Sequence, residues 1–171
     1  MKKEELFERG QKLERLSTRL SSQFEHTITN SRWFATIVIA ETAGILKFTE
    51  VAKGGRFALM TFALGFLAIS TLLLIVSIIL AQYSKNNLED RITDVLAKLA
   101  QTDLIMENIE AKDAKKESLE DLFSTIREHL DDLYKDLSSD PSNTVAVWCS
   151  YLGLSFFGLG TILAGIAILF G

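Results

Sequence analysis

Two long stretches of the chain contain no charged residue. The first runs from Phe57 to Ser84 and the second from Pro141 to Gly171. About 20 helical residues cross a hydrocarbon core of ~30 Å, so uncharged apolar stretches of this length are typical of membrane-spanning helices. The sequence therefore predicts an all-α membrane protein with two or three transmembrane helices and a cytoplasmic helical hairpin or bundle.

A third, weaker apolar stretch lies between residues 33 and 52. Trp33 to Leu46 is apolar except for Glu41, and Lys47 and Glu50 follow. Because a lysine can extend its amine toward the membrane surface, this stretch is predicted as a marginal span. The Lys53-Gly54-Gly55-Arg56 sequence then predicts a tight turn, since adjacent glycines break helices and adopt positive φ.

The polar segments have helical periodicity. In residues 1–32, the apolar positions recur on one helix face; they are Leu6, Leu13, Leu16, Leu20 and Phe24. In residues 84–140, two blocks follow the 4-3 spacing of a heptad seam, the first containing Leu88, Ile92, Val95 and Leu99 and the second running from Leu119 to Leu137. The break in phase between the blocks favours a hairpin over one long helix, which would carry Val145 too far away to re-enter the membrane.

Four segments follow from these patterns. They are an N-terminal amphipathic cytoplasmic helix (1–32), a transmembrane helical hairpin (33–83), a cytoplasmic acidic coiled helical hairpin (84–140) and a C-terminal transmembrane helix (141–171). The loop Ser138–Asn143, which contains the single proline, is predicted to separate the last two segments.

Charge predicts the orientation in the membrane. Residues 1–32 contain seven Lys/Arg, residues 47–56 contain three and residues 84–141 contain eight. With three spans, the first and last of these zones share a side, which the positive-inside rule assigns to the cytoplasm. Residues 84–140 also contain 15 Asp/Glu, which argues against nucleic-acid binding by this segment.

The sequence contains few residues that could form a catalytic site. One cysteine, Cys149, excludes an intramolecular disulfide, and the sequence contains no phosphate-binding loop and no metal-ligand spacing. We expect no cofactor, no metal and no small-molecule substrate. Arg19 and His26 are weak candidates for a catalytic pair, and a structural role for both is the favoured interpretation.

Polar residues inside the apolar stretches are candidates for a membrane function. A carboxylate near the middle of a span is costly and normally faces a bundle interior or water. The predicted pore-lining or ion-sensing residues are Glu41, Thr61, Ser70, Thr71 and Ser77. An equally weighted alternative is that residues 33–52 lie at the membrane surface, which would leave Glu41 in water.

Small residues form a stripe along the last apolar stretch. Gly153, Gly160, Ala164, Ala167 and Gly171 recur at spacings of 7, 4, 3 and 4. Small residues let helix backbones approach closely in lipid. The stripe predicts a helix interface, either between copies of the chain or with the chain's own spans.

The layout resembles small membrane proteins of bacterial antiphage defence. The similarity rests on the small size, the N-terminal helix that ends in Glu25-His26, the run from Trp33 to Tyr83 and the heptad hairpin. It is greatest to the accessory membrane proteins of type VI-B CRISPR systems and extends in part to SLATT effectors. The resemblance implies a homo-oligomeric pore that perturbs the inner membrane, with Arg19 and His26 matching a divergent HEPN pattern.

Three functions are therefore considered. The first is a homo-oligomeric membrane pore, with the lipid bilayer, further copies of the chain and an RNA-guided effector as partners. The second is a non-conducting adaptor whose acidic helices bind a cytoplasmic protein. The third and most distant is an HEPN-like ribonuclease on a membrane anchor.

Overall fold

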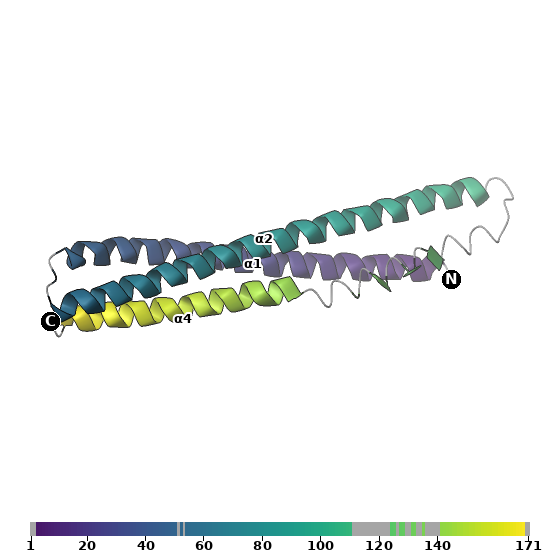
Figure 1. Ribbon diagram of the computed structural model, residues 1–171. Helices are drawn as coiled ribbons and strands as arrows, with labels where there is room; N and C mark the ends of the chain where they lie inside the picture. Colours follow the sequence, from purple (N-terminus) through teal and green to yellow (C-terminus); the bar gives the residue numbers. More distant parts are fainter. Residues whose placement is uncertain are drawn as a thin grey trace. The chain divides into compact units, whose positions relative to one another are not determined.

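In a computed structural model of the chain, the described residues are helical except in the connection at residues 50, 52 and 54 (Figure 1). These residues are 3–50, 52, 54–110, 124–125, 127–128, 131–132, 135 and 141–169. The helices are α1 (Lys3–Thr49), α2 (Gly55–Glu110) and α4 (Pro141–Leu169). The predicted all-α fold class is confirmed for this part of the chain, whereas most of the second arm of the predicted hairpin, and Gly171, lie outside it.

The predicted turn before the second span is confirmed. Gly54 has a φ of 61° and lies between α1 and α2, and Gly55 already begins α2. A side chain at position 54 would be strained in this left-handed conformation, which explains why glycine is found there. The connection is short, so the end of α1 and the start of α2 are close in space.

Two of the predicted element boundaries fall inside continuous helices. α1 passes through residue 32 without a break, and α2 passes through Tyr83. Neither point has a proline or a glycine pair, so nothing in the local sequence stops the helix, although the hydropathy changes sharply. The predicted loop was wrong from Pro141 onward, because Pro141 begins α4; proline is tolerated in the first turn, where its missing N–H has no helical partner.

The chain divides into two compact units. Unit 1 comprises Met1–Gln23 with Ser84–Asp140, and unit 2 comprises Phe24–Tyr83 with Pro141–Gly171. In unit 1, Leu88, Ile92 and Val95 are buried as a heptad seam requires, whereas the side chain of Leu99 is outside the described set.

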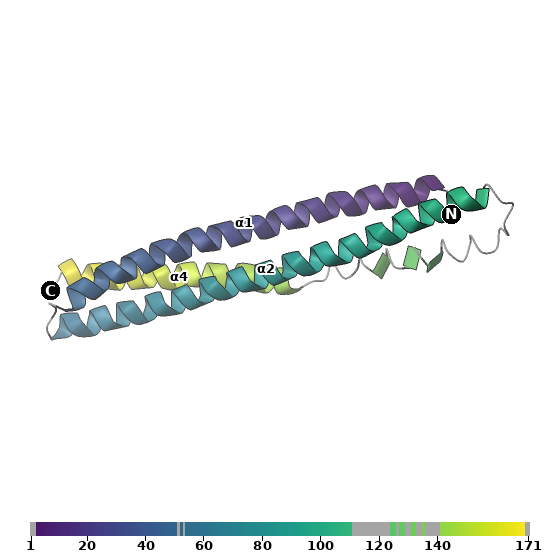
Figure 2. The ribbon, with the colours of Figure 1, turned by 90° about the horizontal axis from the view of Figure 1, so that it is seen from above.

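Unit 2 is a three-helix bundle with up-down-up topology. The C-terminal part of α1, the N-terminal part of α2 and all of α4 run side by side (Figure 2). The core repeats at heptad spacing; it comprises Ala35, Val38, Ile45, Met60, Ala63, Leu67, Leu74, Ala164 and Ala167. An additional stacked ring pair, Phe66 and Phe156, joins α2 to α4 with a centroid separation of 5.8 Å.

Candidate functional site

In unit 2, α2 and α4 approach each other closely. The hydroxyl of Ser70 donates a 2.7 Å hydrogen bond to the carbonyl of Gly153, and one heptad along, Ser77 donates a 2.7 Å bond to the carbonyl of Ala146. The two helices are antiparallel, since seven residues forward on α2 corresponds to seven residues back on α4. A serine hydroxyl can reach a backbone carbonyl of another helix only where the backbones approach closely.

Glycines make this approach possible. A Cβ on Gly153 would lie 3.0 Å from Cγ of Leu74, and a Cβ on Gly160 would lie 3.0 Å from Leu67 and 3.2 Å from the carbonyl oxygen of Ala63. Both distances are shorter than an ordinary carbon contact. In this structure, the predicted small-residue stripe therefore packs against the chain's own α2, with Ala164 and Ala167 buried in the same core.

A cluster of three serines joins all three helices. Ser31 of α1 donates a 3.2 Å hydrogen bond to Ser150 of α4, and its Oγ is also 3.2 Å from Oγ of Ser77 on α2. Ser31, Ser70 and Ser77 are all fully buried. Neither Ser31 nor Ser150 was among the residues predicted from the sequence, although Ser31 lies one heptad before Val38 and one after Phe24, on the buried face of α1.

We expect alanine at position 70 or 77 to destabilise the bundle only slightly. A hydrogen bond of this kind stabilises a membrane helix bundle by about 0.6 kcal/mol on average. The carbonyl of Gly153 or Ala146 would still accept the backbone hydrogen bond within α4. The free energy of unfolding in mixed micelles measures the change. Ser155→Ala is the control, because Ser155 is exposed and bonds only to the carbonyl of Tyr151 on its own helix. A loss above about 2 kcal/mol at position 70 or 77 would contradict this assignment.

The other predicted polar residues occupy different surroundings. Thr61 is exposed and donates to the carbonyl of Phe57, whereas Thr71 is half-buried and donates to the carbonyl of Leu67. The hydroxyls of Ser70 and Ser77 therefore have hydrogen-bond partners inside the bundle. Of the four predicted hydroxyl residues on α2, only Thr61 is exposed.

Glu41 occupies a half-buried flank of α1. It lies between Val38 and Ile45, which are buried core residues on the same helix. Among the residues that the structure describes, no hydrogen bond or ion pair reaches its carboxylate. An unpaired carboxylate beside an apolar core needs water, a proton or a partner from outside the bundle.

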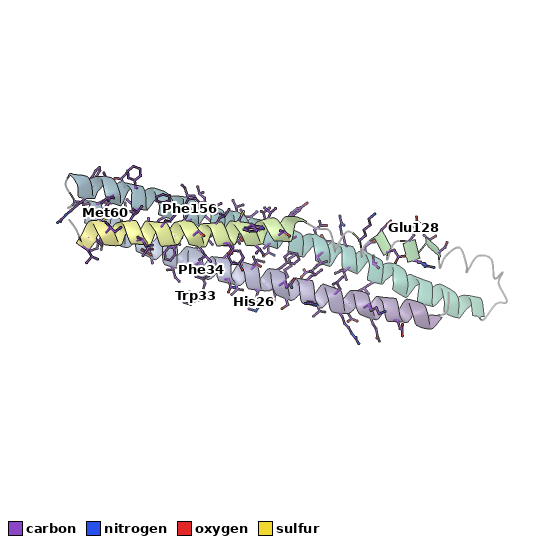
Figure 3. The ribbon with its side chains drawn as sticks, turned by 90° about the horizontal axis from the view of Figure 1, so that it is seen from below. His26, Trp33, Phe34, Met60, Glu128 and Phe156 are labelled. Carbon is purple, nitrogen blue, oxygen red and sulfur yellow. The ribbon has the colours of Figure 1, made fainter. Side chains whose placement is uncertain are left out.

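The outward face of α1 mixes two kinds of side chain. Between the exposed charges of Arg32 and Lys47, the small or hydroxylated ones are Thr36, Ala40 and Ala43, and the large apolar ones are Trp33, Ile37, Ile39 and Leu46. The outward faces of α2 and α4 also present large apolar side chains; examples are Phe62, Leu72, Ile79, Leu159 and Ile162. Figure 3 shows Trp33 and His26 along the same helix, α1, with Phe156 on α4.

The structure does not assemble a catalytic centre from the predicted candidates. Arg19 and His26 are both exposed on α1, seven residues apart, and Cys149 is a free, half-buried thiol. Within the described residues, no group of His, Cys, Asp and Glu side chains could hold a metal ion.

Two of the described helices are long and apolar enough to cross a membrane. They are the Gly55–Ala97 part of α2 and the Thr144–Leu169 part of α4. In the most apolar windows of these helices, only 28% and 22% of the residues are buried, whereas a core helix of a soluble protein would be mostly buried. No protein family, curated protein or solved structure matches the chain.

Proposed function

We propose that this protein is a homo-oligomeric membrane pore whose unit 2 crosses the lipid bilayer. The observation that supports membrane insertion is the inverted polarity of the bundle. Serine hydroxyls are inside, with Ser31, Ser70 and Ser77 at 0% exposure, and bulky apolar side chains are outside. In water this arrangement would expose a large apolar surface, whereas in lipid the exposed apolar side chains contact acyl chains and these three serines stay inside the bundle.

Exposed aromatic residues agree with this placement. Trp33 and Trp148 lie two residues from Ser31 and Ser150, which are in contact, so the two indoles lie within about 6 Å of one another along the bundle. Both are more than 60% exposed. Tryptophan prefers the membrane–water interface, and this level therefore marks one boundary of the bilayer.

The outward face of α1 supports self-association. One stripe of this face, Thr36, Ala40 and Ala43, is small or hydroxylated and gains little from contact with lipid tails, and it lies beside two helices that can span. Copies arranged with this stripe toward a common centre would remove it from lipid and place Thr36 and Ala40 beside a conducting path. Three spans from one chain are too few to enclose a solute, so conduction requires several copies.

In this proposal unit 1 lies in the bacterial cytoplasm, following the Lys/Arg distribution. The architectural resemblance to accessory membrane proteins of CRISPR defence supports a role in antiviral immunity. The trigger would then be an RNA-guided effector in the cytoplasm. The adaptor alternative depends on the acidic segment 84–140, of which residues 111–140 lie mostly outside the described part of the chain.

Cysteine cross-linking tests the assembly. In a Cys149→Ser background, we expect Ala40→Cys to form disulfide-linked dimers between copies in native membranes, because Ala40 is exposed on the outward face of α1. Leu72→Cys is the matched control, since Leu72 is 63% exposed on α2 and faces lipid in this arrangement. Equal cross-linking at both positions, or a monomeric mass in micelles together with no cross-linking, would contradict the ring.

Conduction is tested with the full chain in potassium-loaded vesicles and a potential-sensitive dye. We expect the intact protein to dissipate the potential. Thr36→Leu with Ala40→Leu should reduce the current by narrowing the path, whereas Ile79→Leu should leave it unchanged. An inserted, oligomeric protein that never dissipates the potential would favour the adaptor.

A further inference from the structure

Three basic side chains form a stripe on the part of α1 that belongs to unit 1. Lys12, Arg15 and Arg19 recur at spacings of three and four residues, so they share one helix face, and all three are exposed. Among the residues that the structure describes, none of the three has a hydrogen bond or an ion pair. The half-buried Ser17 and Ser21 lie two residues from this basic stripe and therefore on the opposite side of the helix.

Two acidic side chains form a second stripe, on the part of α2 that belongs to unit 1. Asp90 and Asp94 are exposed and lie four residues apart, on one helix face. The buried Ile92 lies two residues from each of them, so this acidic stripe points away from the seam. Asp94 has a further interaction within its own chain, whereas the carboxylate of Asp90 has none in the described part of the chain. Both stripes therefore face away from the interior of unit 1.

The helix register relates positions on α1 to positions on α2. Ser31 contacts Ser77 and the two helices are antiparallel, so one residue back along α1 corresponds to one residue forward along α2. Both helices continue without a break toward unit 1. The apolar positions there keep the same register, since the half-buried Leu20 falls at the level of the buried Leu88.

In this register the two stripes lie at the same level. Arg19 is one residue, or about 1.5 Å, from the level of Asp90. Arg15 is equally close to the level of Asp94. Each pair is four residues apart on its own helix, so the basic and acidic groups also have the same spacing.

The sign of the charge reverses at the same end of both stripes. Glu8 comes one turn before Lys12 on α1, and Lys98 comes one turn after Asp94 on α2. Position 98 is within two residues of the level of Glu8. The order of charges along one stripe is therefore complementary to the order along the other.

We propose that the basic stripe of one copy docks on the acidic stripe of the next copy. The contact uses two different surfaces of the chain, so it is head-to-tail, and contacts of this kind close into a ring when the rotation between copies allows it. In the membrane arrangement proposed above, all copies are held at one depth, which brings opposite charges together at the same height. The inference rests on the self-association proposed above and does not require conduction.

Charge favours a second copy over a nucleic acid as the occupant of the basic stripe. A nucleic acid would approach unit 1 against residues 84–140, which contain 15 Asp/Glu and eight Lys/Arg. A second copy instead uses those carboxylates. One exposed ion pair contributes little, but several aligned pairs between copies confined to one membrane act together.

The test places one cysteine beside each stripe in a Cys149→Ser background. Ser22 lies one turn from Arg19, and Asn86 lies one turn from Asp90 at the same level as Ser22; both are exposed. A chain with Ser22→Cys and Asn86→Cys carries both halves of the contact. Oxidation of native membranes should therefore give a ladder of dimers, trimers and larger products, and either cysteine alone should give none.

Ser22→Cys with Thr93→Cys is the register control. Thr93 is also exposed on α2, but it lies seven residues, or about 10 Å, from the level of Ser22. This pair should form no ladder.

Charge reversal then tests the electrostatic part of the contact. In the chain with both cysteines, Arg19→Glu or Asp90→Arg alone should reduce the ladder at least about fivefold, because like charges then face each other. When the two variants are co-expressed, they can alternate so that every contact again joins opposite charges. The ladder should then recover.

A ladder that is insensitive to charge reversal, or equal in the register control, would overturn the inference. So would a ladder that disappears on nuclease digestion, because a nucleic acid would then occupy the basic stripe. If Ala40→Cys cross-links between copies but no ladder forms, the self-association survives and this contact is wrong. A ladder without cross-linking at Ala40 supports this contact and contradicts the arrangement of α1 around a common path.

Discussion

Replacing Gly153 and Gly160 together with leucine should separate α4 from α2. Each added Cβ begins 3.0 Å from a leucine side chain and 3.2–3.3 Å from a backbone oxygen of α2, so the helices must move apart. Overpacking of this kind typically costs about 1–3 kcal/mol at each site, and separation also breaks the bonds from Ser70 and Ser77. We expect the double variant to lose its cooperative unfolding transition in mixed micelles.

Gly158 and Gly165 supply the control on the same helix. A Cβ at either position would meet no atom within 4 Å. Gly158→Leu with Gly165→Leu adds the same volume and hydrophobicity to α4, yet it should leave the unfolding transition in place. Equal effects of the two double variants would show that α4 does not pack on α2 through Gly153 and Gly160.

Exchanging the large and small partners at one contact should restore part of the lost stability. Leu74 is fully buried against Gly153, so Leu74→Ala should cost about 2–5 kcal/mol by leaving a cavity. Gly153→Leu alone should also destabilise the bundle. In the combined variant, the leucine on α4 enters the space vacated on α2, and the two losses should not add.

A double-mutant cycle measures this coupling as the departure from additivity of the free energies of unfolding. We expect a favourable interaction of at least about 1 kcal/mol between the two substitutions. Leu67→Ala with Gly153→Leu is the control, because Leu67 packs beside Gly160 one heptad away. Strict additivity in the first pair would mean that Leu74 and Gly153 are not in contact.

Local patterns were sufficient to predict the helical class and the turn at Gly54. Uncharged apolar stretches, heptad spacing and adjacent glycines are local features of the sequence. Each can therefore be interpreted without knowing the rest of the fold. The same patterns predicted a loop through Asn143, whereas α4 begins at Pro141, because proline is tolerated in the first turn of a helix. They also divided α1 at residue 32 and α2 at residue 83, where hydropathy changes but the backbone has no reason to stop.

The pairing of residues between helices could not be derived from the sequence. Ser31, Ser77 and Ser150 come together through contacts between residues 46 and 119 positions apart. Gly153 was identifiable as an interface residue, but its partner, Leu74, depends on the register of α4 against α2. A heptad pattern repeats every seven residues and is therefore compatible with several registers, and only the three-dimensional arrangement selects one of them.

The short connection at Gly54 has a consequence for the biogenesis of the protein. α1 leaves the ribosome first, and it carries Glu41 and Lys47 in a stretch that was not among the two candidate spans. In the proposed membrane arrangement, the residence of α1 in lipid therefore depends on α2, whose apolar half follows only a few residues later. The pair should leave the translocon together as a preassembled hairpin, and a ribosome stalled before α2 emerges should leave α1 outside the bilayer.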